Sequence, residues 1–422
     1  MKQEFDVIVI GAGVVGMATA LTLIEQGHRV TVVDASAKPG MGTSHANGAQ
    51  LCYAYTDALA SPSTLRQLPG LMFASDSAFR LHPSLDPDFL RWGIAFLREC
   101  RASRFLSNTL EGLELAVESR KALDRLSAHF KLAFDQGMPG KLHIYRSAEG
   151  FVAASKIAAV KRDFGIEQHA VDSTGAVAIE PMLAPVGNDI AGALYTPREE
   201  VGDPHLFCTS AGQALLASGR GRAMFSTEVI AISAGQQPAI ETLCGKQLSA
   251  DRLVLCAGTG SPRLARLLGV RIPIQPMKGY SITAQPGAAA PSVCVTDVAN
   301  RIVFARLGDR MRIAGLAELG NRDRAVDPAR IDLLIATARA ALPEAADYNA
   351  IDLRWAGLRP MSPNSLPVIR SIAQGVIANT AHGSLGWTYA AGSAERAARL
   401  LAETFPASRK TRSATELATQ SA

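Results

Sequence analysis

The sequence predicts a mixed α/β fold, in which a domain with a parallel sheet is interleaved with a second, α+β domain built on an antiparallel sheet. Three observations support this prediction. The first 34 residues have the pattern of a strand, a glycine-rich turn, a helix and a second strand. A further strand, glycine-rich turn and helix follow near the end of the chain, at 376–403. Between them lie stretches of strand-like composition at 141–145, 301–307 and 310–316.

Length and composition narrow the class of protein. The chain has 422 residues, of which 48% are hydrophobic and 19% are charged. At roughly 150 residues per domain this predicts two or three domains with a large core, which excludes a disordered chain and a coiled coil. The net charge of +5 is spread along the chain and aromatic residues make up only 6%. Clustered basic residues are therefore missing, and nucleic acid is not an expected partner.

The cysteines and the short motifs exclude other classes. Six cysteines lie far apart without a C-x-x-C pair, so the sequence has no metal-ligand spacing and indicates a reduced, cytoplasmic protein. No P-loop, H-E-x-x-H motif or Ser-His-Asp arrangement is recognisable, which disfavours an NTPase, a metalloenzyme or a hydrolase. An uncharged stretch at 7–24 is long enough to suggest a membrane span, but its glycines and acidic flanks indicate a different structure.

The N-terminal pattern predicts a binding site for an adenine dinucleotide in a Rossmann-like domain. A buried strand is expected at 5–10, a helix at 17–26 and a second strand at 29–33. Gly11 would make the tight turn, Gly13 would let the pyrophosphate approach and Gly16 would let the helix pack closely. Asp34 would accept hydrogen bonds from a ribose. The turn and the first helical residues would then contact the phosphates, namely Gly11, Ala12, Gly13, Val14, Val15 and Gly16.

Two further segments favour FAD over NAD. A loop of small and hydroxylated residues follows Asp34, and its Thr43, Ser44 and His45 would contact a cofactor that extends beyond its ADP half. Gly258 lies in another small-residue turn after the expected strand 252–256. The second glycine-rich turn would direct a helix N-terminus at the flavin ring and stabilise negative charge on it. Its expected contacts are Gly383, Ser384, Leu385, Gly386, Trp387 and Thr388.

Several segments together resemble one enzyme family. They are GAGVVG at 11–16, GTSHANGAQL at 42–51, MKGYSI at 277–282, LRPMSPNSLPVI at 358–369 and NTAHGSLGWT at 379–388. In this order they resemble the bacterial D-amino-acid dehydrogenases of the FAD-dependent amino-acid oxidase (glycine oxidase-like) superfamily. The resemblance extends to about residue 404. His45, Gly48-Ala49-Gln50 and Asn364-Ser365 depart from the usual pattern, which leaves the substrate range open.

The resemblance implies oxidative deamination of D-amino acids to 2-oxo acids and ammonia, with hydride transfer from Cα to flavin N5. It further implies that electrons pass to a quinone-type respiratory acceptor, and hence an association with the inner face of the cell membrane. A covalent link from FAD to His45, as in related dimethylglycine and sarcosine dehydrogenases, is not expected because their histidine lies one position further along. His45 would instead hydrogen-bond the cofactor or line the pocket.

Three residues are candidates for the substrate site. Arg359 would bind the substrate carboxylate, because its planar guanidinium matches a carboxylate in two parallel hydrogen bonds and because the resemblance places the substrate arginine here. Tyr280 would donate its phenol hydrogen to the same carboxylate, or lie half-buried on a strand. His382 would contact flavin or substrate, or support the turn.

The domains are expected to be discontinuous. Residues 1–56, 196–264 and 356–404 would form the FAD-binding domain, residues 57–195 and 265–355 the substrate domain, and residues 405–422 a flexible tail. Helices within 88–132 are expected in the substrate domain. Three alternatives remain: an oxidase or dehydrogenase for glycine, proline or hydroxyproline-like imino acids, a flavoprotein with a structural FAD, and an NAD-only dehydrogenase.

Overall fold

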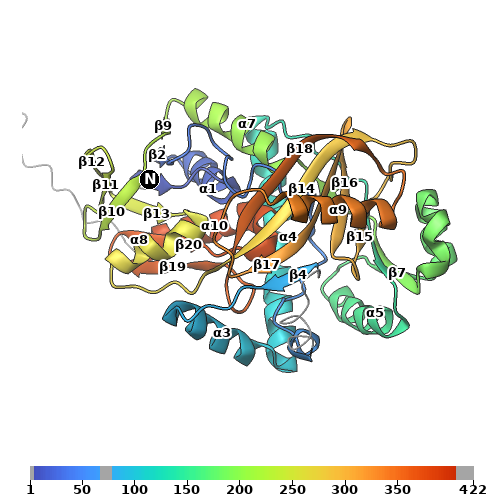
Figure 1. The fold of residues 1–422 in the computed structure, drawn as a ribbon. Coiled ribbons are helices and arrows are strands. Elements are labelled where there is room, and N and C mark those ends of the chain that lie inside the picture. Colours follow the sequence, from blue (N-terminus) through green and yellow to red (C-terminus); the bar gives the residue numbers. More distant parts are fainter. Residues whose placement is uncertain (1–3, 67–77, 405–422) are drawn as a thin grey trace, which may run out of the picture.

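A computed structural model describes residues 4–66 and 78–404 of the chain. Two sheets organise these residues and lie side by side (Figure 1). The first has six strands in the order β19-β20-β13-β1-β2-β9 and is parallel except for β19, which pairs antiparallel with β20. Its strands are β1 (Asp6–Ile10), β2 (Arg29–Val33), β9 (Gly221–Met224), β13 (Arg252–Leu255), β19 (Val368–Ala373) and β20 (Val376–Thr380).

Both faces of this sheet are covered. Val7 and Val9 of β1 belong to one apolar cluster, while Ile8 and Ile10 belong to another, because successive side chains of a strand point to opposite faces. The first cluster includes helices α1 (Val14–Glu25), α4 (Ala102–Phe130), α7 (Pro204–Ala217) and α10 (Gly386–Thr404). The second includes α8 (Ser261–Leu267) and part of a small sheet of β10 (Val229–Ser233), β11 (Ala239–Thr242) and β12 (Gln247–Ser249).

The position of α4 differs from our prediction. We expected the helices within 88–132 to belong to the substrate domain, but Leu115, Leu123 and Leu126 of α4 pack in one cluster with α1 and α10. The periodicity of the sequence shows that α4 has an apolar face, but it does not show which sheet that face covers.

The second sheet has nine strands and is mixed. Its order is β18-β14-β17-β16-β15-β5-β7-β6, with β4 beside β17, and the pairs β5–β15 and β4–β17 are parallel. The strands expected at 141–145, 301–307 and 310–316 are β5, β16 and β17. The strands are β4 (Phe79–Leu81), β5 (Lys141–Tyr145), β6 (His169–Val171), β7 (Gly192–Thr196), β14 (Gln275–Pro286), β15 (Cys294–Asp297), β16 (Ile302–Leu307), β17 (Arg310–Leu319) and β18 (Ala346–Met361).

Helices cover the outer side of the nine-stranded sheet. Ile331 and Leu334 of α9 (Pro328–Ala341) pack on Tyr280 and Ile282 of β14, and α9 crosses the strands in Figure 1. The remaining elements are α3 (Pro87–Glu99), α5 (Ala148–Arg162), α6 (Ser173–Ile179), the 3₁₀ helices η1 (Pro181–Asp189), η2 (Gly258–Gly260) and η3 (Gly383–Leu385), and the short pair β3 (Gln50–Leu51) and β8 (Glu200–Val201).

The uncharged stretch at 7–24 forms most of β1, the glycine turn and most of α1. Within the described ranges, no helix is long and apolar enough to cross a membrane. The strands of the six-stranded sheet come from three separate stretches of the chain, as a discontinuous domain requires. The predicted domain boundaries themselves remain predictions, and the predicted tail at 405–422 lies outside the described residues.

Candidate FAD and substrate site

The glycine turn after β1 leaves room for a ligand at the start of α1. Gly11 has a φ of +111°, and its N–H donates to the Val33 carbonyl at 2.8 Å. A Cβ on Gly16 would overlap the Gly11 carbonyl oxygen, so only glycine allows α1 to start here. Gly13 precedes α1 without a side-chain cap, and Ser44 Oγ accepts the Val14 N–H at 3.1 Å. This arrangement presents the helix N-terminus to an anion.

The carboxylate of Asp34 is held beside this turn. Its two oxygens accept the Ala12 N–H at 2.6 Å and the Ser36 N–H at 2.7 Å. Because each carboxylate oxygen has a second acceptor position, a ribose hydroxyl can still bind. Gly258 lies after the neighbouring strand β13 with a φ of +53°, and nothing lies within 4 Å of the position of its Cβ. These positions agree with the predicted dinucleotide site.

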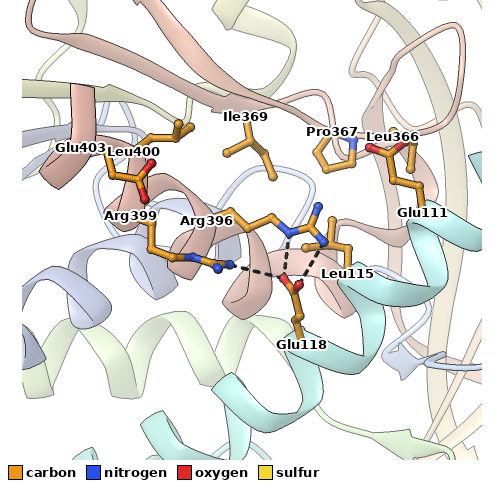
Figure 2. A pocket seen from close by; sticks show the side chains of 10 residues that line it. All are labelled: Glu111, Leu115, Glu118, Leu366, Pro367, Ile369, Arg396, Arg399, Leu400 and Glu403. Atoms are coloured by element: carbon orange, nitrogen blue, oxygen red, sulfur yellow. Dashed lines mark hydrogen bonds and ion pairs between the residues drawn. The ribbon is translucent and has the colours of Figure 1, made fainter. Parts of the chain in front are cut away.

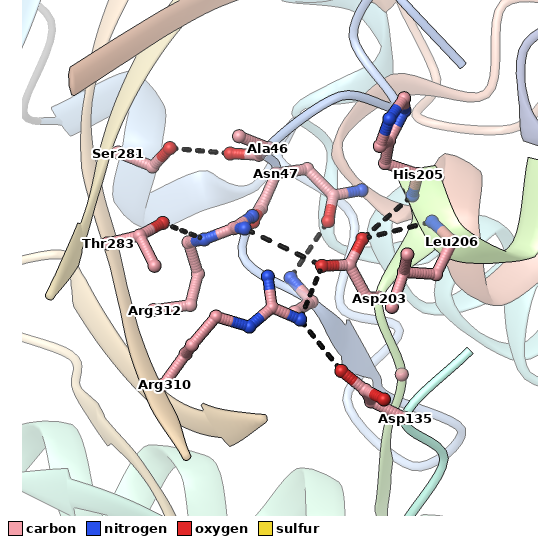
Figure 3. A network of polar contacts seen from close by, with 12 residues as sticks. Ala46, Asn47, Asp135, Asp203, His205, Leu206, Ser281, Thr283, Arg310 and Arg312 are labelled. Carbon is pink, nitrogen blue, oxygen red and sulfur yellow. Dashed lines mark hydrogen bonds and ion pairs between the residues drawn. The ribbon is translucent and has the colours of Figure 1, made fainter. Parts of the chain in front are cut away.

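The loop that follows Asp34 is fixed to the nine-stranded sheet through its own backbone carbonyls. Arg312 donates to the Asn47 carbonyl at 2.9 Å, and Ser281 Oγ donates to the Ala46 carbonyl (Figure 3). Arg312 also donates to Thr283 Oγ1 at 2.7 Å and lies 3.7 Å from the Asp203 carboxylate. Burial lowers the pKa of Arg312 to about 10. Neither Arg312 nor Asp203 was predicted from the sequence, since neither lies in a recognisable motif.

Thr43 and His45 differ in their surroundings. Thr43 lines the cavity described below, and its hydroxyl donates to the Leu358 carbonyl at 2.6 Å. The His45 ring lies edge-on to His205 of α7, with 4.7 Å between the ring centroids, and it is not among the lining residues. Burial, together with the nearby His205 and Arg312, lowers the pKa of His45. The structure therefore shows His45 against α7, and its predicted role at the cofactor stays a prediction.

The second glycine turn directs α10 at the same cavity. Gly383 has a φ of +58°, and Ser384, Leu385 and Trp387 line the cavity. Thr388 Oγ1 accepts the Cys52 N–H at 3.0 Å and thereby joins α10 to the loop. Gly386 begins α10. The start of α10 is thus placed to stabilise negative charge in the cavity.

The cavity has a volume of about 310 Å³ and lies between the loop 43–50, the start of α10 and the nine-stranded sheet. Arg359 of β18 lines it and stays partly exposed. A Cβ on Gly279 would lie 2.4 Å from the guanidinium carbon and both terminal nitrogens of Arg359, so this group rests flat on the glycine. Within the described part of the chain no carboxylate pairs with Arg359, and burial lowers its pKa to about 10. A carboxylate ligand would satisfy this charge.

The hydroxyl of Tyr280, the second substrate candidate, is directed at a carboxylate on the α9 side of the sheet. Tyr280 lies on β14, whose alternation places Gly279 and Ser281 toward the cavity and the Tyr280 side chain on the α9 side. Its hydroxyl donates to Glu318 Oε1 at 3.3 Å. Tyr280 is nevertheless among the residues that line the cavity. Its hydroxyl is engaged by Glu318, which disfavours a bond to the substrate carboxylate, and its predicted role stays a prediction.

His382 is turned away from the cavity. Its Nε2 lies 2.8 Å from Ser393 Oγ of α10, and burial lowers its pKa to about 3, so the imidazole is neutral. The residue is not among those that line the cavity. The structure thus supports the alternative in which His382 holds the turn, and it does not support the predicted contact with substrate.

A buried polar cluster that the sequence analysis missed forms one wall of the cavity. Lys141 of β5 is 2% exposed and donates to Gln50 Oε1 at 2.7 Å and to Cys52 Sγ at 2.8 Å. His143 of the same strand stacks on Tyr55 with 4.1 Å between the centroids. Glu199 lies nearby, and burial raises its pKa to about 7. Period-2 alternation in KLHIY predicts that Lys141 and His143 share one face of the strand, but it does not predict that this face lines the cavity.

A second hollow lies on the surface between α4, α10 and β19 (Figure 2). Its volume is about 440 Å³, and its charged groups include Glu118, which pairs with Arg396 at 2.7 Å and with Arg399 at 3.7 Å. None of the predicted site residues lines it. The cavity at Arg359 is therefore the candidate site.

The residues fit an extended dinucleotide with a flat ring at its far end. The glycine turn and Asp34 suit its phosphates and ribose, and the loop 43–50 leads to a cavity that faces a second helix N-terminus. The sequence profile described as FAD dependent oxidoreductase matches residues 6–400. The chain belongs to this family. FAD is accordingly its cofactor, and the chain is an FAD-dependent enzyme.

Curated relatives match most of the chain. The chain is 38% identical over 415 residues to D-amino acid dehydrogenase 2 of Ralstonia nicotianae, and the alignment covers 95% of this chain and 97% of the relative. It is 39% identical over 402 residues to D-amino acid dehydrogenase of Paramagnetospirillum magneticum, which covers 94% of each chain. These relatives support an FAD-dependent oxidation of amino acids by this chain.

Solved structures confirm the fold. Glycine oxidase from Geobacillus kaustophilus superposes with a TM-score of 0.71 at 20% identity and covers 95% of both chains. L-proline dehydrogenase from P. horikoshii superposes with a TM-score of 0.73 at 16% identity, with coverage of 96% of this chain and 95% of the other. The predicted mixed α/β fold is confirmed.

Proposed function

We propose that this chain oxidises D-amino acids to 2-oxo acids and ammonia and transfers the electrons to a quinone-type respiratory acceptor. The observation that carries the proposal is the Arg359 guanidinium, which lines the cavity without a carboxylate partner among the described residues. The names of the relatives at 38% and 39% identity support D-amino acids as the substrate class.

FAD, when bound, supplies the acceptor for the α-hydrogen of the substrate and its bonding electron pair. The protein then has to orient the substrate and keep its amine neutral. Arg359 holds the carboxylate in two parallel hydrogen bonds, which fixes the position of Cα. The oxidised substrate carries a C=N bond, and addition of water releases the 2-oxo acid and ammonia.

Replacement of Arg359 tests the anchor. Arg359→Met leaves a substrate carboxylate unpaired in the cavity, and we expect kcat/KM to fall at least 10²-fold, about 3 kcal/mol, while FAD remains bound. Arg354→Met is the matched control, because Arg354 is exposed on the same strand and donates to the Ile351 carbonyl. An unchanged kcat/KM in Arg359→Met would remove Arg359 from the site.

A quinone acceptor would lie in the cell membrane, and we propose that the exposed side of α3 contacts the membrane surface. Leu90, Ile94 and Leu97 are 46–54% exposed and recur at i, i+4 and i+7, so they form one apolar stripe. Exposed arginines flank the stripe at 91, 98, 101 and 104. On its other side α3 buries Trp92 and Phe96. A helix that is apolar on both sides and flanked by arginines suits the surface of an anionic bilayer.

This helix also lies next to the candidate site. Trp92 Nε1 donates to the Met361 carbonyl at 2.9 Å, and Trp92 and Phe96 pack in one cluster with Met277 and Phe79, which line the cavity. A membrane bound at α3 would therefore lie near the cavity from which a quinone would take electrons. We propose the cytoplasmic face of the cell membrane as the location of this contact.

Sedimentation with lipid vesicles tests the membrane contact. We expect the protein to sediment with vesicles that contain about one third phosphatidylglycerol, and the triple variant Leu90→Ser, Ile94→Ser and Leu97→Ser to remain in the supernatant. The matched control is Leu216→Ser, Leu243→Ser and Leu267→Ser, because these leucines are 54–69% exposed elsewhere on the surface. Equal sedimentation of the α3 variant and the control would refute the contact.

Reoxidation identifies the electron acceptor. Enzyme that has been reduced by substrate without oxygen is mixed either with a soluble quinone or with air-saturated buffer. The proposal predicts faster reoxidation by the quinone. Faster reoxidation by oxygen would indicate an oxidase.

A further inference from the structure

One end of the cavity carries buried polar groups that have no partner among the described residues. His143 is 0% exposed, and neither of its ring nitrogens has a hydrogen-bond partner within 4–66 and 78–404. Thr296 of β15 is 8% exposed, and its hydroxyl has no partner in this part of the chain either. Both residues line the cavity. Buried polar groups without a partner are rare in folded proteins, and here three such atoms lie at one place.

The register of the sheet places these atoms together and apart from Arg359. Thr296 pairs with His143 on one side and with Val303 on the other, and Val303 pairs with Ala314, which in turn pairs with Ser281 of β14. All five line the cavity and form one row across the sheet. The row is polar at His143 and Thr296 and apolar at Val303 and Ala314. The Arg359 guanidinium rests on Gly279 of β14, so Val303 and Ala314 lie between it and the polar end of the row.

We propose that His143 and Thr296 bind the end of the substrate side chain and select long side chains that end in an uncharged amide, of the glutamine type. This inference rests on the proposed function, in which Arg359 holds the carboxylate. Three strand spacings, roughly 14 Å along the sheet, separate β14 from β15. The guanidinium–carboxylate pair up to Cα takes up about 5 Å of this distance, and the hydrogen bond at the far end takes up about 3 Å. The side chain must therefore span about 6 Å to cross Val303 and Ala314 and reach Thr296, which a glutamine-type side chain does only when extended.

The charges around His143 favour an uncharged group. Burial and the nearby Lys141 and Lys161 hold the pKa of His143 well below its usual value, so the ring is neutral and offers one donor and one acceptor. A primary amide likewise offers both a donor, its N–H group, and an acceptor, its carbonyl oxygen. A third ammonium group would be repelled by Lys141 and Lys161.

A carboxylate side chain is not favoured either, because both lysines are already engaged. Lys141 donates to Gln50 and Cys52, and Lys161 donates to the Ala54 carbonyl at 2.8 Å and pairs with Asp57. Glu199 also faces this region, since Lys141 and Lys161 both act on its ionisation. Arg301, which also lines the cavity, packs its guanidinium over the Phe79 ring, 5.3 Å from the ring centroid. A buried substrate carboxylate would therefore have to compete with existing partners at Lys141, Lys161 and Arg301.

The test compares kcat/KM for D-glutamine with that for D-methionine, D-glutamate and D-asparagine. D-methionine has a similar length without the amide, D-glutamate carries a charge, and D-asparagine is shorter. For the unmodified enzyme we expect kcat/KM to be at least tenfold higher for D-glutamine than for each of the others, because a site built to hydrogen-bond rejects analogues without the group.

Two variants locate the preference. His143→Phe and Thr296→Val are each expected to lower kcat/KM for D-glutamine at least tenfold and to change that for D-methionine less than threefold, with an unchanged flavin spectrum. Thr296→Val keeps the side-chain volume and reports on the site even if His143→Phe fails to fold. His169→Phe is the control, because His169 is exposed on β6 and interacts with Glu167.

The possible failures can be told apart. If D-methionine is used as well as D-glutamine, or if both substrates decline in parallel in the variants, the inference is wrong while the proposed function stands. A parallel decline with an altered flavin spectrum would instead assign His143 to the cofactor. If no amino acid reduces the enzyme, the proposed function fails and the inference fails with it.

Discussion

Gly279→Ala displaces Arg359, the proposed substrate anchor, without changing any charge. The new Cβ would lie 2.4 Å from three atoms of the Arg359 guanidinium, whereas carbon atoms in contact with each other lie about 3.5 Å apart. The guanidinium must therefore move by about 1 Å. A displacement of this size at a reacting group can reduce the rate about 10²-fold, which corresponds to about 2.7 kcal/mol. We expect kcat/KM for a D-amino acid to fall by this factor while FAD remains bound.

Steady-state kinetics with a dye as electron acceptor measures this effect, and the flavin absorbance reports the FAD content. Gly137→Ala is the matched control, because its Cβ would meet Val201 Cγ2 at an ordinary 3.5 Å and should leave kcat/KM unchanged. If Gly279→Ala retains FAD and its kcat/KM lies within threefold of the unmodified enzyme, Arg359 does not hold the substrate and the reasoning is refuted.

Three further variants test other parts of the site. Burial raises the pKa of Glu199 to about 7, so the folded state binds a proton more tightly than the unfolded state, and stability falls as the pH rises from about 4.5 through 7. Glu199→Gln should remove up to about 3 kcal/mol of this fall. Urea unfolding at pH 5 and pH 8 would measure the effect, and an equal fall in both proteins would contradict it. His382→Ala should cost about 1–3 kcal/mol of stability by removing the contact with Ser393, with kcat/KM within threefold, whereas a large kinetic loss in a stable variant would return His382 to the catalytic site. Gly16→Ala should yield protein without FAD, because its Cβ overlaps the Gly11 carbonyl oxygen, and a full complement of FAD on purification would show that the turn adjusts.

The dinucleotide end of the site was predictable because its signals are local. Gly11, Gly16 and Asp34 act through backbone conformation and hydrogen bonds within one strand-turn-helix-strand unit. The second helix after the turn at 383–386 was predictable for the same reason, although α10 begins at Gly386 and the sequence predicted its start near Tyr389. Such units fix the positions of their residues with little help from the rest of the chain.

The substrate end depends on contacts between distant strands, and here prediction from sequence was weaker. Ten successive residues of β14 are buried, because α9 covers one face and the cavity lies at the other, so hydropathy did not show that Tyr280 faces α9. Lys141 and His143 were missed because β5 reaches the cavity only through its pairing with β15. The side of the sheet that α4 covers is likewise decided by tertiary packing.

Anaerobic reduction of the bound flavin is the most direct test of the proposed function. The purified enzyme is mixed with D-amino acids, L-amino acids, glycine and proline, and its absorbance is followed at about 450 nm, where oxidised flavins absorb. Rapid bleaching by D-amino acids, and slow or no bleaching by the others, is the expected result. Bleaching by glycine or proline alone would contradict the proposed substrate class, and no bleaching by any of them would contradict the assignment of Arg359 as the substrate anchor.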